Sequence, residues 1–340
     1  MAQVAVGLMG LGRIGRNLVR ILYDRDDVRL AAISDPADHA ALEYLLRYDT
    51  ILGRFPAPVS LKDGHLHVAG RQIEMLAAED PGQAPWGELG VDVVVEATGK
   101  ARSREELERH LAAGAKRVIL CAPPRDAPDI TVVMGVNDHL LRPEHRIVSN
   151  ASVTAHAAAP ILAILQRAFG IERAFVSAVH AYSSQLRLAD VPAEDMRTGR
   201  AAAENVIPQP SHVADMLMEL LPELRGKLSG MALNVPVPNG SVVDLVCWHE
   251  RPVTKDSVNE AMRTAAADPA WQRILDFEDG PIVSGDIRLS PFSATFDSLA
   301  TMTIGERVSK TLSWFDNGWG YAQRAVDLIQ RFAAIERRAA

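Results

Sequence analysis

The sequence has few cysteines, no long apolar run and no basic cluster, and each absence argues against a class of protein. Two cysteines in 340 residues, Cys121 and Cys247, cannot build a disulfide framework and suit a reducing compartment. No run approaches the 18 consecutive apolar residues that mark a membrane-spanning helix. The net charge of −7, with Lys and Arg scattered, argues against nucleic acid or an anionic membrane as a partner. Residues 1–6 lack the charged start of a secretory signal, so we expect a cytoplasmic protein.

The length and the order of apolar segments predict an α/β protein of two domains. An apolar strand at 3–8, a helix at 14–23 and a strand at 29–34 predict a parallel pair with a right-handed crossover. Further elements suggest one nucleotide-binding domain over the first 150 residues: strands at 92–96, 117–121 and 147–148, a hairpin at 64–74 and a helix at 103–113. The remaining predicted elements are helices at 157–169 and 320–331, and strands at 173–180, 227–236, 241–249, 294–306 and 308–315.

A glycine motif follows the first predicted strand and opens the first helix. Gly10, Gly12 and Gly15 have the G-x-G-x-x-G spacing that gives a tight turn, close approach to a pyrophosphate and close helix packing. Asp35 ends the second predicted strand, where a carboxylate binds ribose hydroxyls and repels a 2′-phosphate. The pattern predicts NAD as cofactor; the alternative is an ordinary glycine turn with an incidental acid.

The small polar segment 149–154 precedes the apolar run 157–165 and marks the start of a helix. Exposed backbone N–H groups at such a start stabilise an anion, and they shift a thiol placed there toward thiolate. The residue in this position is Val153, whose side chain is an inert hydrocarbon.

Many segments, in order along nearly the whole chain, resemble glyceraldehyde-3-phosphate dehydrogenases. The matching segments are 10–16, 35–36, 48–49, 96–99, 114–119, 134–137, 149–152, 180–182, 200–203, 205–208, 221–224, 235–239, 241–245 and 313–317. The resemblance is specific for the family, but it does not by itself establish the family's reaction.

The resemblance implies a Rossmann-type doubly wound parallel sheet in an NAD-binding domain over 1–150, joined by the C-terminal helix 318–340. It implies an α+β catalytic domain with a mixed or antiparallel sheet over 151–317, and a homotetramer, possibly mixed with a paralogue, in which loop 183–208 lies near a neighbour's cofactor. In the family, the position of Asn317 holds the nicotinamide carboxamide, that of Thr98 lies along the cofactor and that of Tyr321 packs near its ring. The other positions assigned to the cofactor side are Arg13, Ile14, Gly99 and Cys121.

The resemblance also implies a reaction that this chain lacks the nucleophile to perform. In the family a Cys stands at the position of Val153 and attacks the aldehyde, while the His matched by His180 activates the thiol and moves a proton. Valine has no lone pair, so neither a thiohemiacetal nor a thioester can form. We therefore expect the phosphorylating reaction to be absent or vestigial.

Other departures from the family pattern lie around this position. Asn234 replaces an Arg expected to clamp a substrate phosphate, and it loses both the charge and the fork. The acid that often accompanies that Arg is matched by Gln185, and His212 replaces a Gly in a phosphate loop. Four positions retain anion-binding character: Ser152, Thr154, Ser183 and Arg200. Ser211 replaces a Thr in the phosphate loop and is also assigned to anion binding. The pattern indicates a pocket remodelled for a different or less anionic ligand.

The sequence allows two interpretations for several side chains. His180 is either a proton-transfer group or a structural histidine, and His156 either faces the pocket or packs in place of an Asn. His212 either binds an anion or has no such role, and Cys121 is either a displaced nucleophile or a small buried residue. The spacing of the three histidines matches no standard metal site, so no metal is expected.

The leading functional hypothesis is an NAD-dependent oxidoreductase acting on a small (phospho)sugar-like aldehyde or alcohol without a covalent thioester, with His180 as base. The alternative is a catalytically silent NAD-binding family member with a regulatory or assembly role. A third possibility is slow aldehyde oxidation through the hydrate.

Overall fold

The computed structural model describes residues 3–184 and 186–339, which form two compact units. The first unit comprises the chain up to Met134, Asp138–Ser152 and the chain from Ala322 onward; the second comprises Gly135–Asn137 and Val153–Tyr321. The division thus falls two residues later than the sequence suggested, and the last helix belongs to the second unit as far as Tyr321. None of the helices in the described ranges has the length and apolar character needed to span a membrane.

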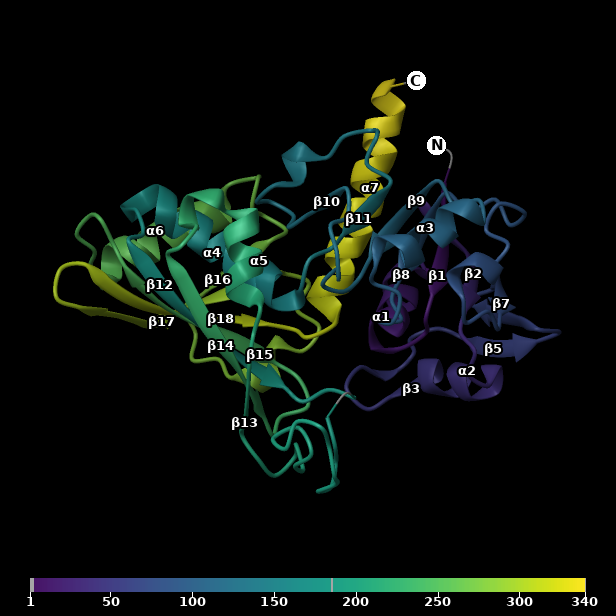
Figure 1. Ribbon diagram of the computed structural model, residues 1–340, viewed down its shortest axis with the longest axis horizontal. Coiled ribbons are helices and arrows are strands. Elements are labelled where there is room, and N and C mark those ends of the chain that lie inside the picture. Colours follow the sequence, from purple (N-terminus) through teal and green to yellow (C-terminus); the bar gives the residue numbers. More distant parts are fainter. Residues whose placement is uncertain (1–2, 185, 340) are drawn as a thin grey trace. The chain divides into compact units, whose positions relative to one another are not determined.

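A nine-stranded sheet forms the centre of the first unit (Figure 1). The strand order is β10-β11-β9-β8-β1-β2-β7-β6-β5; neighbours from β10 to β7 are parallel, and β6 and β5 are antiparallel. The strands are β1 (Val4–Met9), β2 (Val28–Ser34), β5 (Val59–Lys62), β6 (His65–Val68), β7 (Arg71–Leu76), β8 (Val93–Glu96), β9 (Arg117–Leu120), β10 (Ile130–Thr131) and β11 (Ile147–Ser149). The other elements are α1 (Arg13–Leu22), α2 (His39–Arg47), the small pair β3 (Tyr48–Asp49) and β4 (Gly53–Arg54), α3 (Arg104–Ala112) and α7 (Trp319–Ala339).

The chain reverses its direction of travel across this sheet next to β1. It proceeds from β1 to β2 and β7 on one side, and then returns to place β8 on the other side of β1. In doubly wound sheets, ligands bind at such a switch point, outside the carboxyl ends of the strands. The segments after β1 and β8, which begin at Gly10 and Ala97, occupy this position.

A seven-stranded mixed sheet forms the second unit, with order β13-β14-β12-β15-β18-β17-β16. Its elements are α4 (Val153–Phe169), β12 (Arg173–Ala181), β13 (Ile207–Gln209), α5 (Val213–Leu220), β14 (Leu228–Val235), β15 (Ser241–Trp248), α6 (Lys255–Ala267), β16 (Leu275–Glu278), β17 (Ala294–Ile304) and β18 (Val308–Phe315). Helix α4 contacts α5 and α6, and these three helices cover one face of the sheet. Burial alternates along β15 and β18, as expected for a sheet covered on one side.

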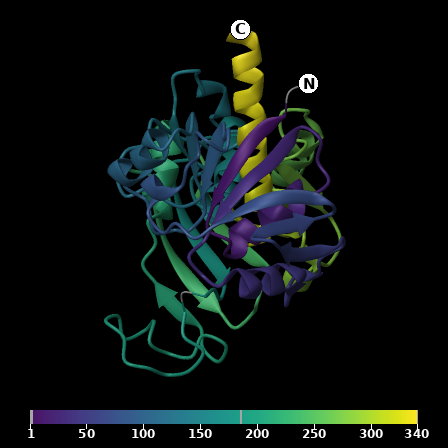
Figure 2. The same ribbon diagram turned by 90° about the vertical axis from the view of Figure 1, so that its right-hand side faces the viewer.

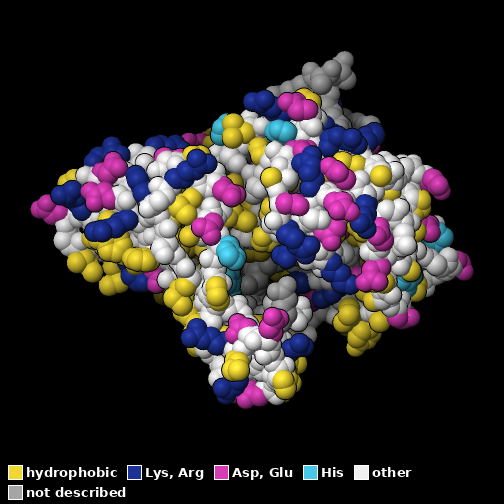
Figure 3. Space-filling view, viewed as in Figure 1, with side chains coloured by type: hydrophobic (Ala, Val, Ile, Leu, Met, Phe, Trp, Pro, Cys, Tyr) yellow, Lys and Arg dark blue, Asp and Glu magenta, His cyan; other side chains and the backbone are white. Residues whose placement is uncertain are grey.

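The opposite face of this sheet carries many apolar side chains around an ion pair of Lys310 with Asp244, and within the described ranges no helix packs on it. Its exposed members are Phe175, Met231, Met302 and Ile304, with between 42% and 75% of each side chain accessible. Val242, Val246, Leu312 and Trp314 lie on the same face and are partly buried. Hydrophobic side chains gather over β17 in Figure 3, and the segment 186–206 extends away from this sheet in Figures 1 and 2.

The elements expected from the sequence are present, with ends that shift by a few residues, but the list was incomplete. Helix α4 begins at Val153 rather than at residue 157, and the last helix runs beyond residue 331 to Ala339. Helices α2 and α6 were not expected, nor were the short strands β3, β4, β5, β10, β13 and β16. Each of the two missed helices buries only two side chains of its own, which leaves a weak periodic signal.

Gly15 allows the first turn of α1 to pack directly on the glycine loop. A Cβ at Gly15 would lie 2.2 Å from the carbonyl oxygen of Gly10, whereas a Cβ at Gly12 would meet no atom within 4 Å. We expect Gly15→Ala to lower the free energy of unfolding by about 1–3 kcal/mol, because backbone must move to relieve the overlap. Gly12→Ala is the matched control, with an expected change of less than about 1 kcal/mol. Urea denaturation measures both; equal effects would contradict the packing account.

Candidate functional site

The glycine loop lies at the carboxyl end of β1 and is held against the segment after β8. Gly10 has φ +94°, a backbone conformation that favours glycine. A Cβ on it would lie 2.9 Å from the backbone nitrogen of Thr98, so the two segments touch. Gly12 is exposed and caps α1, and Arg13 and Ile14 begin the helix. The backbone N–H groups of this first turn form the kind of site that binds a phosphate.

Asp35 follows β2 and lies beside this loop. Its Oδ2 accepts the backbone N–H of Leu11 at 2.8 Å, and its Oδ1 accepts that of Ala37 at 3.0 Å. Each carboxylate oxygen can accept further hydrogen bonds. The acid is therefore fixed next to the loop with capacity to bind a ribose hydroxyl, as the NAD assignment requires.

Cys121 occupies the carboxyl end of β9, the strand next to β8. Its backbone N–H donates to the carbonyl oxygen of Glu96 at 2.8 Å, and its side chain is buried. Burial raises the pKa of the Cys121 thiol, and the nearby charge of Glu96 raises it further. A thiol in this environment stays protonated, which favours the reading of a small buried residue over a displaced nucleophile.

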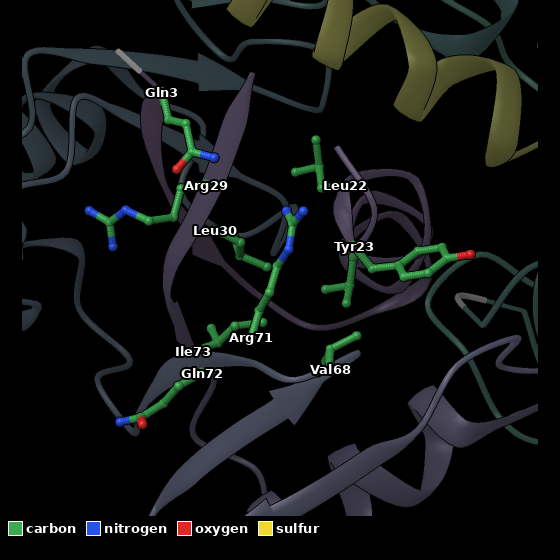
Figure 4. A pocket seen from close by; sticks show the side chains of 10 residues that line it. Gln3, Leu22, Tyr23, Arg29, Leu30, Val68, Arg71, Gln72 and Ile73 are labelled. Carbon is green, nitrogen blue, oxygen red and sulfur yellow. The ribbon is translucent and has the colours of Figure 1, made fainter. Parts of the chain in front are cut away.

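A cavity of about 310 Å³ opens at the amino ends of the strands of the same sheet, opposite the glycine loop (Figure 4). It is lined by Gln3, Val19, Leu22, Tyr23, Arg29, Leu30, Val68, Arg71, Gln72 and Ile73. The Arg71 side chain reaches into the space beside Leu22 and Tyr23, whereas Arg29 points away from it. Arg71 Nη2 donates to Asp26 Oδ1 at 3.1 Å, and its Nη1 donates to the carbonyl oxygen of Arg25. The cavity lies at the amino ends of β1 and β2, so none of the expected cofactor residues lines it.

In the second unit, the first turn of α4 meets the end of β12. Thr154 Oγ1 lies 3.3 Å from His180 Nε2, and the His180 ring makes an edge-on contact with Phe315, with 6.1 Å between ring centroids. Burial lowers the pKa of His180 below its usual value, so the imidazole is neutral near pH 7. Val153 is the first residue of α4 and is partly exposed. A neutral imidazole from β12 thus lies against the first turn of α4, whose first residue has a hydrocarbon side chain.

Asn234 is the register partner of His180 on the adjacent parallel strand β14. Its amide Nδ2 donates to Gln209 Oε1 of β13 at 2.7 Å, and its side chain is buried. The position at which the resemblance expects a cationic clamp thus contains a neutral amide pair. This arrangement does not supply the charge-assisted, bidentate contact by which an Arg binds a phosphate.

Asn317 is held by a network at the end of β18. Its Nδ2 donates to Ser241 Oγ at 2.6 Å, and the same hydroxyl accepts the backbone N–H of Ala181 at 3.0 Å. The Asn317 backbone N–H donates to Asn239 Oδ1 at 3.3 Å. Among the described residues, no donor reaches the buried Asn317 Oδ1. A buried acceptor in this state fits the amide N–H of a nicotinamide, since such atoms are normally satisfied.

The two other histidines have different surroundings. The buried His156 ring contacts Tyr321 edge-on, with 5.7 Å between centroids, which favours a packing role for both. His212 is almost fully exposed, and its Nδ1 lies 3.6 Å from Asp215 Oδ2. Ser211 Oγ accepts the backbone N–H of Val213 at 3.3 Å. The structure therefore places His212 at an open helix start rather than in an enclosed anion site.

The remaining expected anion-binding residues belong to different segments of the chain. Arg200 Nε lies 3.0 Å from Asp190 Oδ2 in the exposed segment after β12. Ser152 belongs to the first unit and Ser183 follows β12 in the second. Gln185 lies outside the described residues. Within the described ranges no group of three or more His, Cys, Asp or Glu side chains is arranged to hold a metal ion.

Three residues of this cluster were missed by the sequence reasoning: Gln209, Ser241 and Phe315. Gln209 and Asn234 meet only because β13 pairs with β14, a register that no local pattern specifies. Ser241 and Phe315 begin and end paired strands, and both lie within or beside segments that match the family. Those matches were a signal for membership of the site, but not for contact with His180 or Asn317.

Comparison with known proteins agrees with both halves of this description. Residues 4–104 match the family model "Glyceraldehyde 3-phosphate dehydrogenase, NAD binding domain", and residues 152–317 match its C-terminal domain. A glyceraldehyde-3-phosphate dehydrogenase of Streptomyces coelicolor is 46% identical over 96% of this chain and 97% of its own length. That of Geobacillus stearothermophilus is 45% identical over 97% and 98%, and glyceraldehyde-3-phosphate dehydrogenase 2 of Bacillus subtilis is 43% identical over 98% and 97%. With this coverage and two adjoining domains, the chain belongs to the glyceraldehyde-3-phosphate dehydrogenase family, with the family's α/β fold and NAD as its cofactor.

Proposed function

We propose that this family member is an NAD-dependent oxidoreductase that acts on a small (phospho)sugar-like aldehyde or alcohol without a covalent thioester. The observation that carries the proposal is the pairing of a hydrocarbon side chain, Val153, with a neutral histidine, His180, at the start of α4. The base is retained, and the atom that would bond to the substrate is replaced by one that cannot.

Hydride transfer requires a carbon that carries hydrogen and a group that takes the hydroxyl proton. NAD, when bound, accepts or donates the hydride. For an alcohol or an aldehyde hydrate, the neutral His180 imidazole takes the O–H proton as the C–H bond breaks, and the electron pair of the O–H bond forms the carbonyl. Thr154 Oγ1, 3.3 Å from Nε2, holds the ring in position for this transfer.

The lining of the His180 cluster supports a substrate less anionic than a triose phosphate. Asn234 and Gln209 satisfy each other and contribute no charge. Arg200 is paired with Asp190. Amide and hydroxyl groups are suited to hydroxyl-bearing carbon chains, which they bind by neutral hydrogen bonds.

For the cofactor, we propose that the Gly10 loop with Arg13 and Ile14 binds the pyrophosphate, that Asp35 binds the adenosine ribose, and that Thr98 and Gly99 lie along the dinucleotide. Asn317 Oδ1 accepts the carboxamide N–H. The close packing of Gly10 on Thr98 and the unsatisfied acceptor of Asn317 support these roles.

A second candidate is a catalytically silent NAD-binding member with a regulatory or assembly role. It is favoured by the simultaneous loss of the nucleophile and of the cationic clamp. Turnover unaffected by His180→Ala, together with a mixed tetramer containing a Cys-bearing relative, would support this candidate over the enzyme.

We also propose that the chain assembles into a homotetramer. The uncovered face of the second sheet supports self-association, because exposed apolar patches of this kind mark protein interfaces. Phe175, Met231 and Ile304 on this face would be buried in such an assembly.

Val153→Cys tests the assignment of the first helical residue. The new thiol is expected to react with iodoacetamide at neutral pH, since a helix start lowers thiol pKa. The wild-type chain is the matched control: Cys121 and Cys247 are buried, and burial raises the pKa of Cys247 to about 12. We expect no phosphate-dependent oxidation of glyceraldehyde 3-phosphate by the variant, because Asn234 carries no charge. If Val153→Cys alone gains that activity, the pocket still recognises a triose phosphate.

The pH dependence of turnover tests His180. Its neutral form is the base, and burial lowers its pKa, so the rate should hold as pH falls through 6.5 and decline only below it. His180→Asn should remove this acidic limb and reduce kcat by about 10²- to 10⁴-fold. Initial rates of NADH formation, over a panel of polyols, sugar phosphates and aldehydes, give both results. A panel without turnover, or a variant with the wild-type profile, would contradict the role of His180.

Phe175→Asp tests the proposed interface. Because this side chain is 55% exposed in the single chain, the change should leave folding intact while its charge disrupts an apolar contact between subunits. Light scattering after gel filtration should show a smaller assembly. Leu140→Asp, at a residue 50% exposed in the first unit, is the matched control and should leave the mass unchanged. An unaltered mass for Phe175→Asp would exclude this face from the interface.

A further inference from the structure

A line of polar side chains, buried at one end and reaching the cofactor loop at the other, crosses the first unit. Trp86 Nε1 donates to His110 Nδ1 at 3.0 Å, and His110 Nε2 lies 3.1 Å from Glu96 Oε2. Glu96 Oε1 accepts the backbone N–H of Thr98 at 2.8 Å and also the Thr98 hydroxyl. Trp86, His110 and Glu96 are each 0% exposed.

The order of donors in this line leaves one arrangement of protons. An indole N–H can only donate, so His110 Nδ1 must accept and carries no proton. The proton of the neutral ring is then on Nε2, which donates to Glu96 Oε2. Both Glu96 oxygens act as acceptors, and the three donors facing them compensate a carboxylate that would otherwise be costly to bury.

The far end of the line supports the glycine loop. Thr98 Oγ1 accepts the backbone N–H of Lys100 at 3.0 Å, and the backbone N–H of Ala97 donates to the carbonyl oxygen of Met9 at 2.8 Å. The backbone of Thr98 lies so close to Gly10 that a Cβ there would be 2.9 Å from its nitrogen. A shift of Thr98 would therefore displace Gly10.

We propose that Trp86, His110 and Glu96 are positioning residues that fix Thr98 beneath Gly10, and that they act through the single tautomer of His110. This inference rests on the proposed cofactor role of the Gly10 loop. The three residues lie behind the loop within the protein and do not themselves contact the cofactor in this scheme.

Glu96→Gln keeps the shape of the side chain but replaces one acceptor oxygen by an NH₂ donor. If the amide oxygen faces Thr98, the amide NH₂ faces the Nε2–H of His110, and donor meets donor. A change of tautomer relieves this contact but turns Nδ1–H toward the indole N–H of Trp86. If the amide is reversed, its NH₂ faces the Thr98 backbone N–H. Each arrangement leaves a buried donor facing another donor.

Removal of the indole N–H should relieve the conflict. In the double variant Trp86→Phe/Glu96→Gln, His110 can carry its proton on Nδ1 and accept from the amide on Nε2. If the residues have only a structural role, the losses of NAD affinity caused by the two substitutions should add. If they act through the tautomer of His110, the second substitution should restore the affinity lost by the first.

The test is the dissociation constant for NAD, measured by isothermal titration calorimetry on the full chain, together with the thermal midpoint. We expect Glu96→Gln to weaken NAD binding by about tenfold or more, and the double variant to return within about threefold of Trp86→Phe alone. Ser309→Ala is the matched control: it removes a hydroxyl 2.7 Å from the buried His249 Nε2 in the second unit. It should lower the thermal midpoint without changing NAD affinity.

Suppose that the wild-type chain binds NAD. The inference is then overturned if Glu96→Gln binds NAD with equal affinity, or if the double variant does not regain affinity. In both cases the proposed function is unaffected. A wild-type chain that fails to bind NAD overturns the proposed function first. If Glu96→Gln does not fold, a folded double variant supports the inference, because removal of the indole N–H has then restored stability. If neither folds, His110→Phe decides, because it removes the donor to Glu96 at a residue that does not contact the cofactor in this scheme. NAD binding weakened by about tenfold supports the positioning role, and unchanged affinity overturns it.

Discussion

The contact between Thr154 and His180 at the start of α4 is the interaction on which the proposed chemistry of the second unit depends. It holds a neutral imidazole against the first turn of a helix, where backbone N–H groups favour negative charge. In this setting a thiol would be a strong nucleophile, and Val153 supplies a hydrocarbon instead. We propose that the helix start keeps its electrostatic character and its base, and that covalent catalysis is lost. The neutral pair of Asn234 and Gln209 on the neighbouring strands agrees with this change.

The first unit depends on close backbone packing rather than on charge at its surface. Gly15 packs on Gly10, and Gly10 packs on Thr98, so the glycine loop with the start of α1 meets the distant segment after β8 where the sheet changes direction. Glu96 is buried behind them and provides the negative charge that gathers the Thr98 donors. A chain that had lost the use of a dinucleotide would have little reason to keep this packing. The retained loop thus fits the family assignment and NAD as cofactor.

Features carried by local sequence were predictable, and those carried by long-range register were not. The glycine spacing, Asp35 and the apolar strands around them have local signatures, and the structure places them together at the carboxyl edge of the first sheet. His180 and Asn317 were identified through the resemblance, but the hydroxyl of Ser241 that holds Asn317 was not. Trp86, Glu96 and His110 come from a loop, a strand and a helix, and no periodic pattern links them. The pairing of Asn234 with Gln209 likewise exists only because two strands align in one register.

The absence of a covalent bond between chain and substrate is the central claim, and the mass of the intact protein during turnover tests it most directly. Wild-type protein would be mixed with NAD and a substrate that it oxidises, quenched with acid within the first turnovers and analysed by mass spectrometry. The account predicts the unmodified mass at every time point while NADH accumulates. A transient increment equal to the acyl group of the substrate, appearing and decaying at the rate of turnover, would contradict it.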